Sequence, residues 1–182
     1  MILLHSCCGP CSASVLPQLD LKEVKVWFYN PSIYPEPEYY RRLDAQKKVC
    51  DYFGVELIVP EYDHNEFISR VVNYIQCPEC GSRCSVCFYD RFVRLGVAAK
   101  ELGADTICTT LTVSPYKDSF QVLSQLYRAA NICELNFIDT DFEGCSFKLP
   151  FQIYEQDYCG CEFSIPAKPI ERCNKGCANC II

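Results

Sequence analysis

Short apolar runs alternate with longer stretches of mixed polarity along most of the chain. The apolar runs predict strands at residues 2–5, 24–29, 55–59, 106–110 and 135–138. The stretches between them predict helices at residues 12–19, 36–52, 63–74, 85–102 and 119–130. Strands and helices that alternate through short links are typical of βαβ units. We therefore expect an α/β fold with an open parallel sheet of about five strands and flanking helices.

The first predicted strand leads directly into a turn with three cysteines. Residues 2–5 are followed by Cys7 and Cys8, then by Gly9-Pro10, then by Cys11. Adjacent thiols at a strand end point in different directions and pair with each other only under strain. Cys7 and Cys8 therefore suit two metal ions or two corners of one cluster. The turn should lie at the carboxyl edge of the sheet, where open α/β folds bind their ligands.

The composition indicates one packed domain outside the membrane. The chain has 182 residues, of which 49% are hydrophobic, enough for a core of its own. The net charge of −6 argues against nucleic-acid binding over the whole surface but permits a local basic patch. No run is apolar enough to span a bilayer, and Met1 leads into the first strand without a signal-peptide pattern. We expect a cytoplasmic protein with no membrane partner.

Cysteine is unusually frequent, with 16 residues. Twelve lie in four groups: Cys7, Cys8 and Cys11; Cys77, Cys80, Cys84 and Cys87; Cys159 and Cys161; and Cys173, Cys177 and Cys180. Without a sign of export, such groups favour metal binding or redox chemistry over a disulfide scaffold, although hyperthermophile cytosol is an exception. Small buried apolar roles are expected for the isolated Cys50, Cys108, Cys133 and Cys145.

One candidate metal site joins Cys7 and Cys8 to Cys84 and Cys87. The second pair stands at the start of a predicted helix, where both sulfurs can face one point and the helix dipole favours thiolates. Four thiolates can hold a [4Fe–4S] cluster, which we favour because sites at this edge of a sheet are usually functional. A structural zinc ion is the alternative, since spacing does not distinguish iron from zinc.

A second candidate site consists of Cys159 and Cys161, which flank a single glycine. Two thiols at this separation can close a small strained disulfide ring, and strain makes a disulfide easier to reduce. The sequence leaves open whether they form a labile redox pair or two metal ligands. Either use is favoured over two inert thiols.

A third site is predicted between the loop at residues 77–81 and the end of the chain. The loop has the Cys-Pro-x-Cys-Gly form of a zinc knuckle. Its cysteines and those of the tail are Cys77, Cys80, Cys173, Cys177 and Cys180. A metal site that ties the tail to the loop is favoured, with structural zinc, a second cluster and disulfides left open. A last helix is predicted around residues 150–156, and the chain divides into a catalytic domain, 1–163, and a cysteine-rich tail packed on it, 164–182.

The charged residues give weaker signals. Basic residues on the predicted helix at 36–52 could follow a phosphate backbone together with three later arginines, although a solvated surface is the simpler interpretation. They are Arg41, Arg42, Lys47, Lys48, Arg83, Arg91 and Arg94. Of the two histidines, His5 is the better candidate for a proton donor because it stands beside the cysteines, and a buried structural histidine is the alternative.

Five motifs, in this order, resemble the QueH family, the cobalamin-independent epoxyqueuosine reductases of tRNA modification. They are His5-Ser6-Cys7-Cys8-Gly9-Pro10-Cys11, Phe28-Tyr29-Asn30-Pro31-Ser32-Ile33-Tyr34-Pro35, Arg83-Cys84-Ser85-Val86-Cys87-Phe88, Thr109-Thr110-Leu111-Thr112-Val113-Ser114-Pro115 and Tyr158-Cys159-Gly160-Cys161. The resemblance extends to about Phe163. It includes neither the Cys77 and Cys80 pair nor the tail, so no family role is assigned to them.

The resemblance implies a fold of the HUP type, related to nucleotide-α-hydrolase and tRNA-thiolating domains. It implies a [4Fe–4S] cluster on Cys7, Cys8, Cys84 and Cys87. A further iron near the cluster, held by cysteine and aspartate, also fits the family. Its candidate ligands are Cys11, Cys159, Cys161 and Asp63.

The reaction implied by the resemblance is the reduction of epoxyqueuosine in the tRNA anticodon loop to queuosine. Two electrons and two protons remove the epoxide oxygen as water, with a redox role for Cys159 and Cys161 and a proton from His5 or Tyr158. The implied partners of this oxidoreductase are tRNA and an unidentified electron donor, and we expect a monomer. Candidate stacking and phosphate contacts to the RNA are Tyr29, Tyr34, Tyr39, Tyr40, Tyr116, Arg41 and Arg42.

Two other functions remain open from the sequence. A tRNA sulfur-transfer enzyme on the same fold would need an ATP-binding glycine loop after the first strand, where this chain has Cys-Cys-Gly-Pro-Cys. A non-enzymatic iron–sulfur or zinc-binding redox module would lack affinity for tRNA. ATP binding and tRNA binding therefore discriminate between the three functions.

Overall fold

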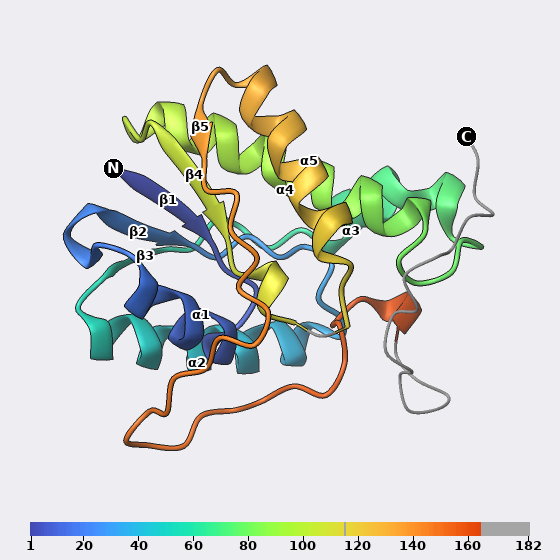
Figure 1. Ribbon diagram of the computed structural model, residues 1–182. Coiled ribbons are helices and arrows are strands. Elements are labelled where there is room, and N and C mark those ends of the chain that lie inside the picture. Colours follow the sequence, from blue (N-terminus) through green and yellow to red (C-terminus); the bar gives the residue numbers. More distant parts are fainter. Residues whose placement is uncertain (115, 165–182) are drawn as a thin grey trace.

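A parallel sheet with the strand order β3-β2-β1-β4-β5 forms the centre of the computed structural model, which describes residues 1–114 and 116–164 (Figure 1). The strands are β1 Ile2–His5, β2 Val24–Trp27, β3 Glu56–Ile58, β4 Thr106–Thr109 and β5 Asn136–Phe137. All pairings between these neighbours are parallel. The chain runs outward from β1 to β3 and then returns to β4 on the other side, so the topology switches between β1 and β4. The predicted open parallel sheet is confirmed.

The helices cover both faces of this sheet (Figure 1). They are α1 Gly9–Val15, α2 Glu36–Phe53, α3 His64–Val71, α4 Ser82–Glu101 and α5 Ser119–Ile132. Helices α1 and α2 pack together on one face, α4 and α5 on the other, and α3 packs against α4. Short 3-10 helices occupy Leu16–Gln18, Leu21–Glu23, Val72–Tyr74, Leu111–Val113 and Glu162–Ser164. None of the described helices is both long and apolar enough to cross a membrane.

The core has one apolar cluster on each side of the sheet because β1 is apolar on both faces. Leu3 belongs to the cluster under α4 and α5, Leu4 to the cluster under α1 and α2, and both are fully buried. The register pairs His5 with Trp27 of β2 and with Thr109 of β4. The carboxyl ends of three neighbouring strands therefore align, and the cysteine turn follows directly at this edge.

Helix ends follow the local chemistry of the sequence. The Asp63 carboxylate accepts a hydrogen bond from the Glu66 backbone nitrogen and caps α3, as predicted. Gly54, with φ of +66°, ends α2 in the left-handed conformation that glycine adopts without strain. At Gly9 a Cβ atom would lie 2.9 Å from the Ala45 backbone, so glycine allows α1 to approach α2 closely.

The helix predicted at residues 150–156 is wrong. Residues 138–164 form a largely extended segment that passes around α1 and α2, and its only helical element is the 3-10 turn Glu162–Ser164 (Figure 1). Phe147 and Phe151 pack against Tyr52 at the end of α2. These tertiary contacts, and not helical hydrogen bonds, hold the segment in place. Of the predicted tail at 164–182, all but Ser164 lies outside the described residues.

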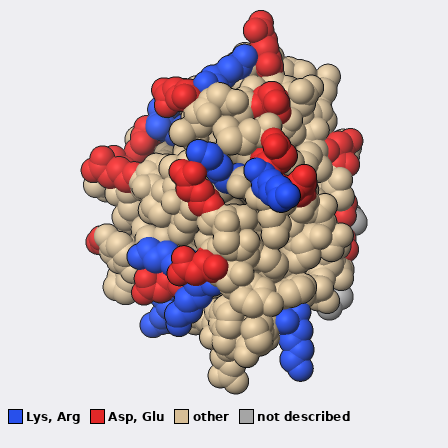
Figure 2. Space-filling view, turned by 90° about the vertical axis from the view of Figure 1, so that its left-hand side faces the viewer, with Lys and Arg blue, Asp and Glu red and all other residues tan. Residues whose placement is uncertain are grey.

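Charges are intermixed on the surface. Figure 2 shows acidic and basic side chains side by side on one face, without a continuous basic stripe. Arg42, Arg83 and Arg91 are no more than 4% exposed, so the predicted basic surface is wrong for these three arginines. Their long side chains instead satisfy buried acceptors.

Candidate functional site

Three thiols gather at the carboxyl end of β1. The sulfurs of Cys7, Cys8 and Cys11 all lie within 4.8 Å of one another, and those of Cys7 and Cys8 are 3.7 Å apart. All three residues are buried. Cys7 lies two residues after the end of β1, Cys8 is the N-cap residue of α1, and Cys11 lies in the first turn of that helix. Three buried sulfurs form a donor set that suits zinc or an iron–sulfur cluster.

A buried polar network supports this turn from below. The Ser6 and Ser12 hydroxyls lie 2.6 Å and 2.9 Å from Gln46 Oε1 on α2, and 2.6 Å from each other. The Asn30 side chain donates to the Ser6 carbonyl at 2.8 Å and accepts from Arg91 at 3.0 Å. These hydrogen bonds position the backbone around the thiols.

The thiols share their protons unequally. Hydrogen bonds from Cys11 and Cys8 lower the pKa of Cys7 well below its usual range. Interaction with Cys7, then with Cys8, raises the pKa of Cys11. Cys7 is therefore the member of the group that loses its proton most readily, and a metal would replace the protons of the thiols that it binds.

Cys84 and Cys87 lie in the first turns of α4, as predicted. Cys84 belongs to the same apolar cluster as Cys7 and Cys8, and burial raises its pKa to about 12. Its sulfur accepts a hydrogen bond from the Cys80 backbone nitrogen at 3.3 Å. The tight three-sulfur group nevertheless has Cys11 as its third member, in place of Cys84 or Cys87. The cluster ligand set of Cys7, Cys8, Cys84 and Cys87 stays a prediction.

Cys159 and Cys161 reach the same edge of the sheet at the end of the extended segment. Both are half-buried free thiols. Cys161 pairs with Ile33 in an antiparallel bridge, and burial, followed by the charges of Cys87 and Cys159, raises its pKa. Cys159 lines one cavity of about 190 Å³ together with Cys7 and Cys11. The structure thus brings the second candidate site up to the first.

Two cationic residues, Arg91 and Lys117, interact electrostatically with cysteines of both groups. Burial disfavours the charge of Arg91, but electrostatic interaction with Cys87 and Cys159 more than offsets this and raises its pKa. Lys117 lines the cavity, and its pKa is raised in the same way by Cys159 and Cys7 against the cost of burial. Sequence reasoning missed both roles. The signal for Arg91 was its spacing of four from Cys87 on one helix face, whereas Lys117 follows β4 in a polar loop that gives no comparable signal.

His5 forms buried hydrogen bonds that link β1 to β4 and to the segment just after β2. It is fully buried, with Nδ1 3.2 Å from the Thr109 hydroxyl and Nε2 3.2 Å from the Tyr29 carbonyl. The carbonyl requires Nε2 to donate, so Nδ1 accepts. Burial lowers the pKa of His5 to about 3, so the ring is neutral. The structure therefore favours the buried structural histidine over the proton donor.

Other predicted site residues lie elsewhere. Asp63 is exposed and caps α3, and it does not join the three-sulfur group. Cys80 is disulfide-bonded and Cys77 is half-buried. The other members of that predicted site, Cys173, Cys177 and Cys180, lie outside the described residues. Among the proposed stacking residues, Tyr29 and Tyr39 are buried, whereas Tyr34 and Tyr40 are 40% and 51% exposed.

Comparisons with known proteins agree on one family. The family model described as Epoxyqueuosine reductase QueH matches residues 2–167. Proteins of that name from Streptococcus pyogenes serotype M1 and Histophilus somni are 32% and 34% identical to the chain. These matches cover 78% and 71% of the chain but 58% and 54% of the relatives, so the chain spans little more than half of their length.

A solved structure shares the fold. It is described as a predicted subunit of tRNA methyltransferase from Methanocaldococcus jannaschii, with a TM-score of 0.52 and 13% identity. The match covers 79% of this chain and 69% of that one. At this identity the likeness concerns the fold alone.

Proposed function

The chain belongs to the epoxyqueuosine reductase QueH family, and from this premise we propose that it reduces epoxyqueuosine in the anticodon loop of tRNA to queuosine. The reaction breaks both carbon–oxygen bonds of the epoxide, forms a carbon–carbon double bond and releases the oxygen as water. It consumes two electrons and two protons. The observation that carries the proposal is the family match over residues 2–167, a range that includes the buried group of Cys7, Cys8 and Cys11.

We propose that Cys7, Cys8, Cys84 and Cys87 hold a [4Fe–4S] cluster. The burial of Cys7 and Cys8 and their shared apolar cluster with Cys84 support this assignment. When bound, the cluster supplies electrons one at a time at low potential. Arg91 and Lys117 provide positive charge to the thiolates, which stabilises the reduced and more negative form.

A further iron is assigned to Cys11 in this proposal. Cys11 lines the cavity with Cys159, whereas Asp63 already caps a helix at the surface and has less support as a ligand. Cys159 and Cys161 would serve as a dithiol that stores two electrons and two protons. At the third predicted site the disulfide of Cys80 favours the disulfide alternative over structural zinc or a second cluster held by Cys77, Cys80, Cys173, Cys177 and Cys180.

The cavity sets how the substrate would approach. Lys117 and Tyr158 line it, and the Lys117 ammonium group could donate a hydrogen bond to the epoxide oxygen. A wider groove of about 670 Å³ lies beside it and shares Pro10 and Ser14 with the cavity. Phe147, Phe151 and Lys148 line that groove, a combination of aromatic and basic side chains that suits an unpaired RNA strand.

Anaerobic preparation followed by iron and sulfide analysis and an EPR spectrum tests the cofactor. Incubation with an anticodon stem–loop that carries epoxyqueuosine, with dithionite as the electron donor, tests the reaction. We expect queuosine among the digested nucleosides. A protein that binds only zinc, or that leaves the epoxide intact while it holds a reducible cluster, would refute the proposal. ATP-dependent sulfur incorporation would support the sulfur-transfer alternative.

A further inference from the structure

The turn at Cys159-Gly160-Cys161 is held from below by a buried arginine. Arg42 donates from Nη1 to the Cys159 carbonyl at 3.1 Å and from Nη2 to the Tyr158 carbonyl at 3.2 Å. Its guanidinium also lies 5.0 Å from the centre of the Tyr158 ring. The arginine is on α2, 117 residues before Cys159, so these contacts exist only in the folded chain.

Arg42 is itself fixed in place. Its Nε donates to Glu38 Oε1 at 2.7 Å, and the Tyr154 hydroxyl donates to the same carboxylate at 2.9 Å. Arg42 is 2% exposed and Glu38 5%. A charge at this depth is stable only when its donors are matched, and each nitrogen of this guanidinium has an acceptor. The pair therefore behaves as a rigid support and differs from a surface ion pair.

The turn also packs closely against the Arg42 guanidinium at Gly160. Gly160 has φ of +102°, and a Cβ there would lie 2.8 Å from Arg42 Nη1. On its other side the Gly160 carbonyl accepts from the Tyr34 backbone nitrogen at 2.8 Å. The Tyr158 hydroxyl donates to the Tyr34 carbonyl at 2.9 Å. Only glycine satisfies both the backbone conformation and the close approach of the guanidinium.

We propose that Arg42 is a positioning residue for Cys159. By fixing the carbonyls of Tyr158 and Cys159, its guanidinium sets where the Cys159 sulfur lies relative to Cys7 and Cys11 in the shared cavity. The functional consequence rests on the proposed function, because it requires that Cys159 takes part in the reaction. The geometric part, a turn held by Arg42, can be tested without it.

The test follows alkylation of single cysteines by mass spectrometry in the full chain, metal-free and reduced. Tryptic cleavage after Lys148 and Arg172 yields a peptide with only Cys159 and Cys161. Cleavage after Lys48 and Arg70 yields one with only Cys50, which is 2% exposed and reports unfolding. We expect Arg42→Met to raise the alkylation rate of Cys159 at least about tenfold, because two hydrogen bonds from a charged donor are lost, while Cys50 stays protected.

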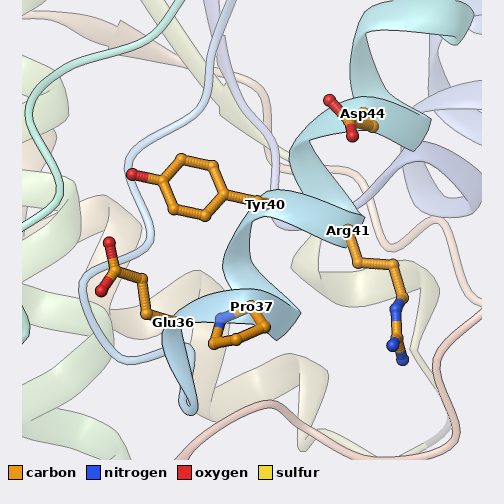
Figure 3. A pocket seen from close by; sticks show the side chains of 5 residues that line it. All are labelled: Glu36, Pro37, Tyr40, Arg41 and Asp44. Carbon is orange, nitrogen blue, oxygen red and sulfur yellow. The ribbon is translucent and has the colours of Figure 1, made fainter.

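Arg41→Met is the matched control. Arg41 lies on the outer face of α2, beside a shallow hollow (Figure 3). It also pairs with Glu38, at 3.6 Å, but it is 59% exposed. The control removes the same charge from the same helical turn and should leave Cys159 alkylation unchanged. Equal rates in Arg42→Met and the wild type, or an equal rise in both variants, would overturn the proposal.

Gly160→Ala tests the same contact from the other side if Arg42→Met exposes Cys50. The new methyl group would displace the guanidinium, so Cys159 alkylation should again rise with Cys50 protected. Where Arg42→Met keeps Cys50 protected, the added methyl has more room, although alanine is still strained at the positive φ, so the effect of Gly160→Ala on Cys159 alkylation should be smaller in Arg42→Met than in the wild type. Full additivity of the two substitutions would overturn the proposed contact.

Turnover on the epoxyqueuosine stem–loop separates this proposal from the proposed function. We expect Arg42→Met to lower kcat with little change in KM. Arg42→Lys should retain only part of the wild-type kcat, because an ammonium group cannot bind both carbonyls as the planar guanidinium does. If Cys159 is alkylated faster in Arg42→Met but the wild type does not turn over the substrate, the proposed function is refuted. The positioning role of Arg42 is then still supported. An unchanged rate of Cys159 alkylation in Arg42→Met would refute the positioning role of Arg42, whatever the turnover of the wild type.

Discussion

Gln156 Nε2 lies 3.1 Å from the sulfur of Cys8, although the two residues are 148 positions apart. The other amide atom, Oε1, is buried and has no hydrogen-bond partner within the described part of the chain. Gln156 lines the cavity together with Cys7 and Cys159. One end of this amide therefore contacts a proposed cluster ligand, and the other end remains available to a bound molecule.

Replacing Gln156 with leucine should lower the reduction potential of the proposed cluster. Hydrogen bonds to ligand sulfurs favour the reduced state because it carries more negative charge. Loss of one such bond corresponds to a shift of about 60 mV for a one-electron couple. A spectroscopic redox titration measures it. Gln152→Leu, on the exposed part of the same segment, is the control, and equal potentials in both variants would contradict the role of the hydrogen bond.

Cys11→Ser should separate the two proposed kinds of iron. We expect acid-labile sulfide to stay at the wild-type level, because the cluster ligands are intact, while the iron in excess of sulfide disappears. Iron and sulfide analysis of anaerobically prepared protein provides the measurement. Parallel loss of iron and sulfide would instead make Cys11 a cluster ligand, as its place beside Cys7 and Cys8 permits. Cys108→Ser, at a buried site away from these groups, is the control.

Gly9→Ala should destabilise the metal-free protein. The added methyl would meet the Ala45 backbone at 2.9 Å, so α1 must move away from α2. Such overpacking lowers the free energy of unfolding by about 1–3 kcal/mol. Urea unfolding of the reduced protein measures the change, with the exposed Ser146→Ala as the reference. An unchanged unfolding midpoint would mean that the two helices do not pack as closely as described.

Lys148→Ala should weaken binding of the anticodon stem–loop and reduce its salt dependence. Lys148 is exposed and lines the groove beside the cavity. Each lost phosphate contact lowers the slope of log affinity against log salt by about 1. Fluorescence anisotropy over a range of salt concentrations gives the slope. Lys100→Ala, at the far end of α4, should leave it unchanged, and the same loss in both variants would argue against the groove.

The sequence was informative where local patterns decide the structure. The apolar run before Cys7 predicted β1, and Gly54 and Asp63 predicted helix ends, because each of these depends on neighbouring residues alone. The path of residues 138–164 was not predictable in this way. It is set by contacts with α2, such as Phe151 against Tyr52, between residues about one hundred positions apart.

Arg42 illustrates the same limit within one helix. Its sequence neighbours Arg41, Lys47 and Lys48 are exposed, and composition alone places it with them. Its spacing of three from the buried Tyr39 and four from the buried Gln46 was the available signal for an inward direction. Its acceptors could not be foreseen, because the carbonyls of Tyr158 and Cys159 reach α2 only after the chain has passed around the sheet.

The long return of the chain from the outer strand β5 to the end of β1 has a consequence for biogenesis. Thiols near the beginning of the chain emerge from the ribosome well before those at residues 159 and 161 can join them. Metal delivered during synthesis would meet an unfinished pocket that is open to oxygen on one side. The proposed centre can therefore be completed only after the turn at residues 159–161 has been synthesised and has reached the carboxyl end of β1.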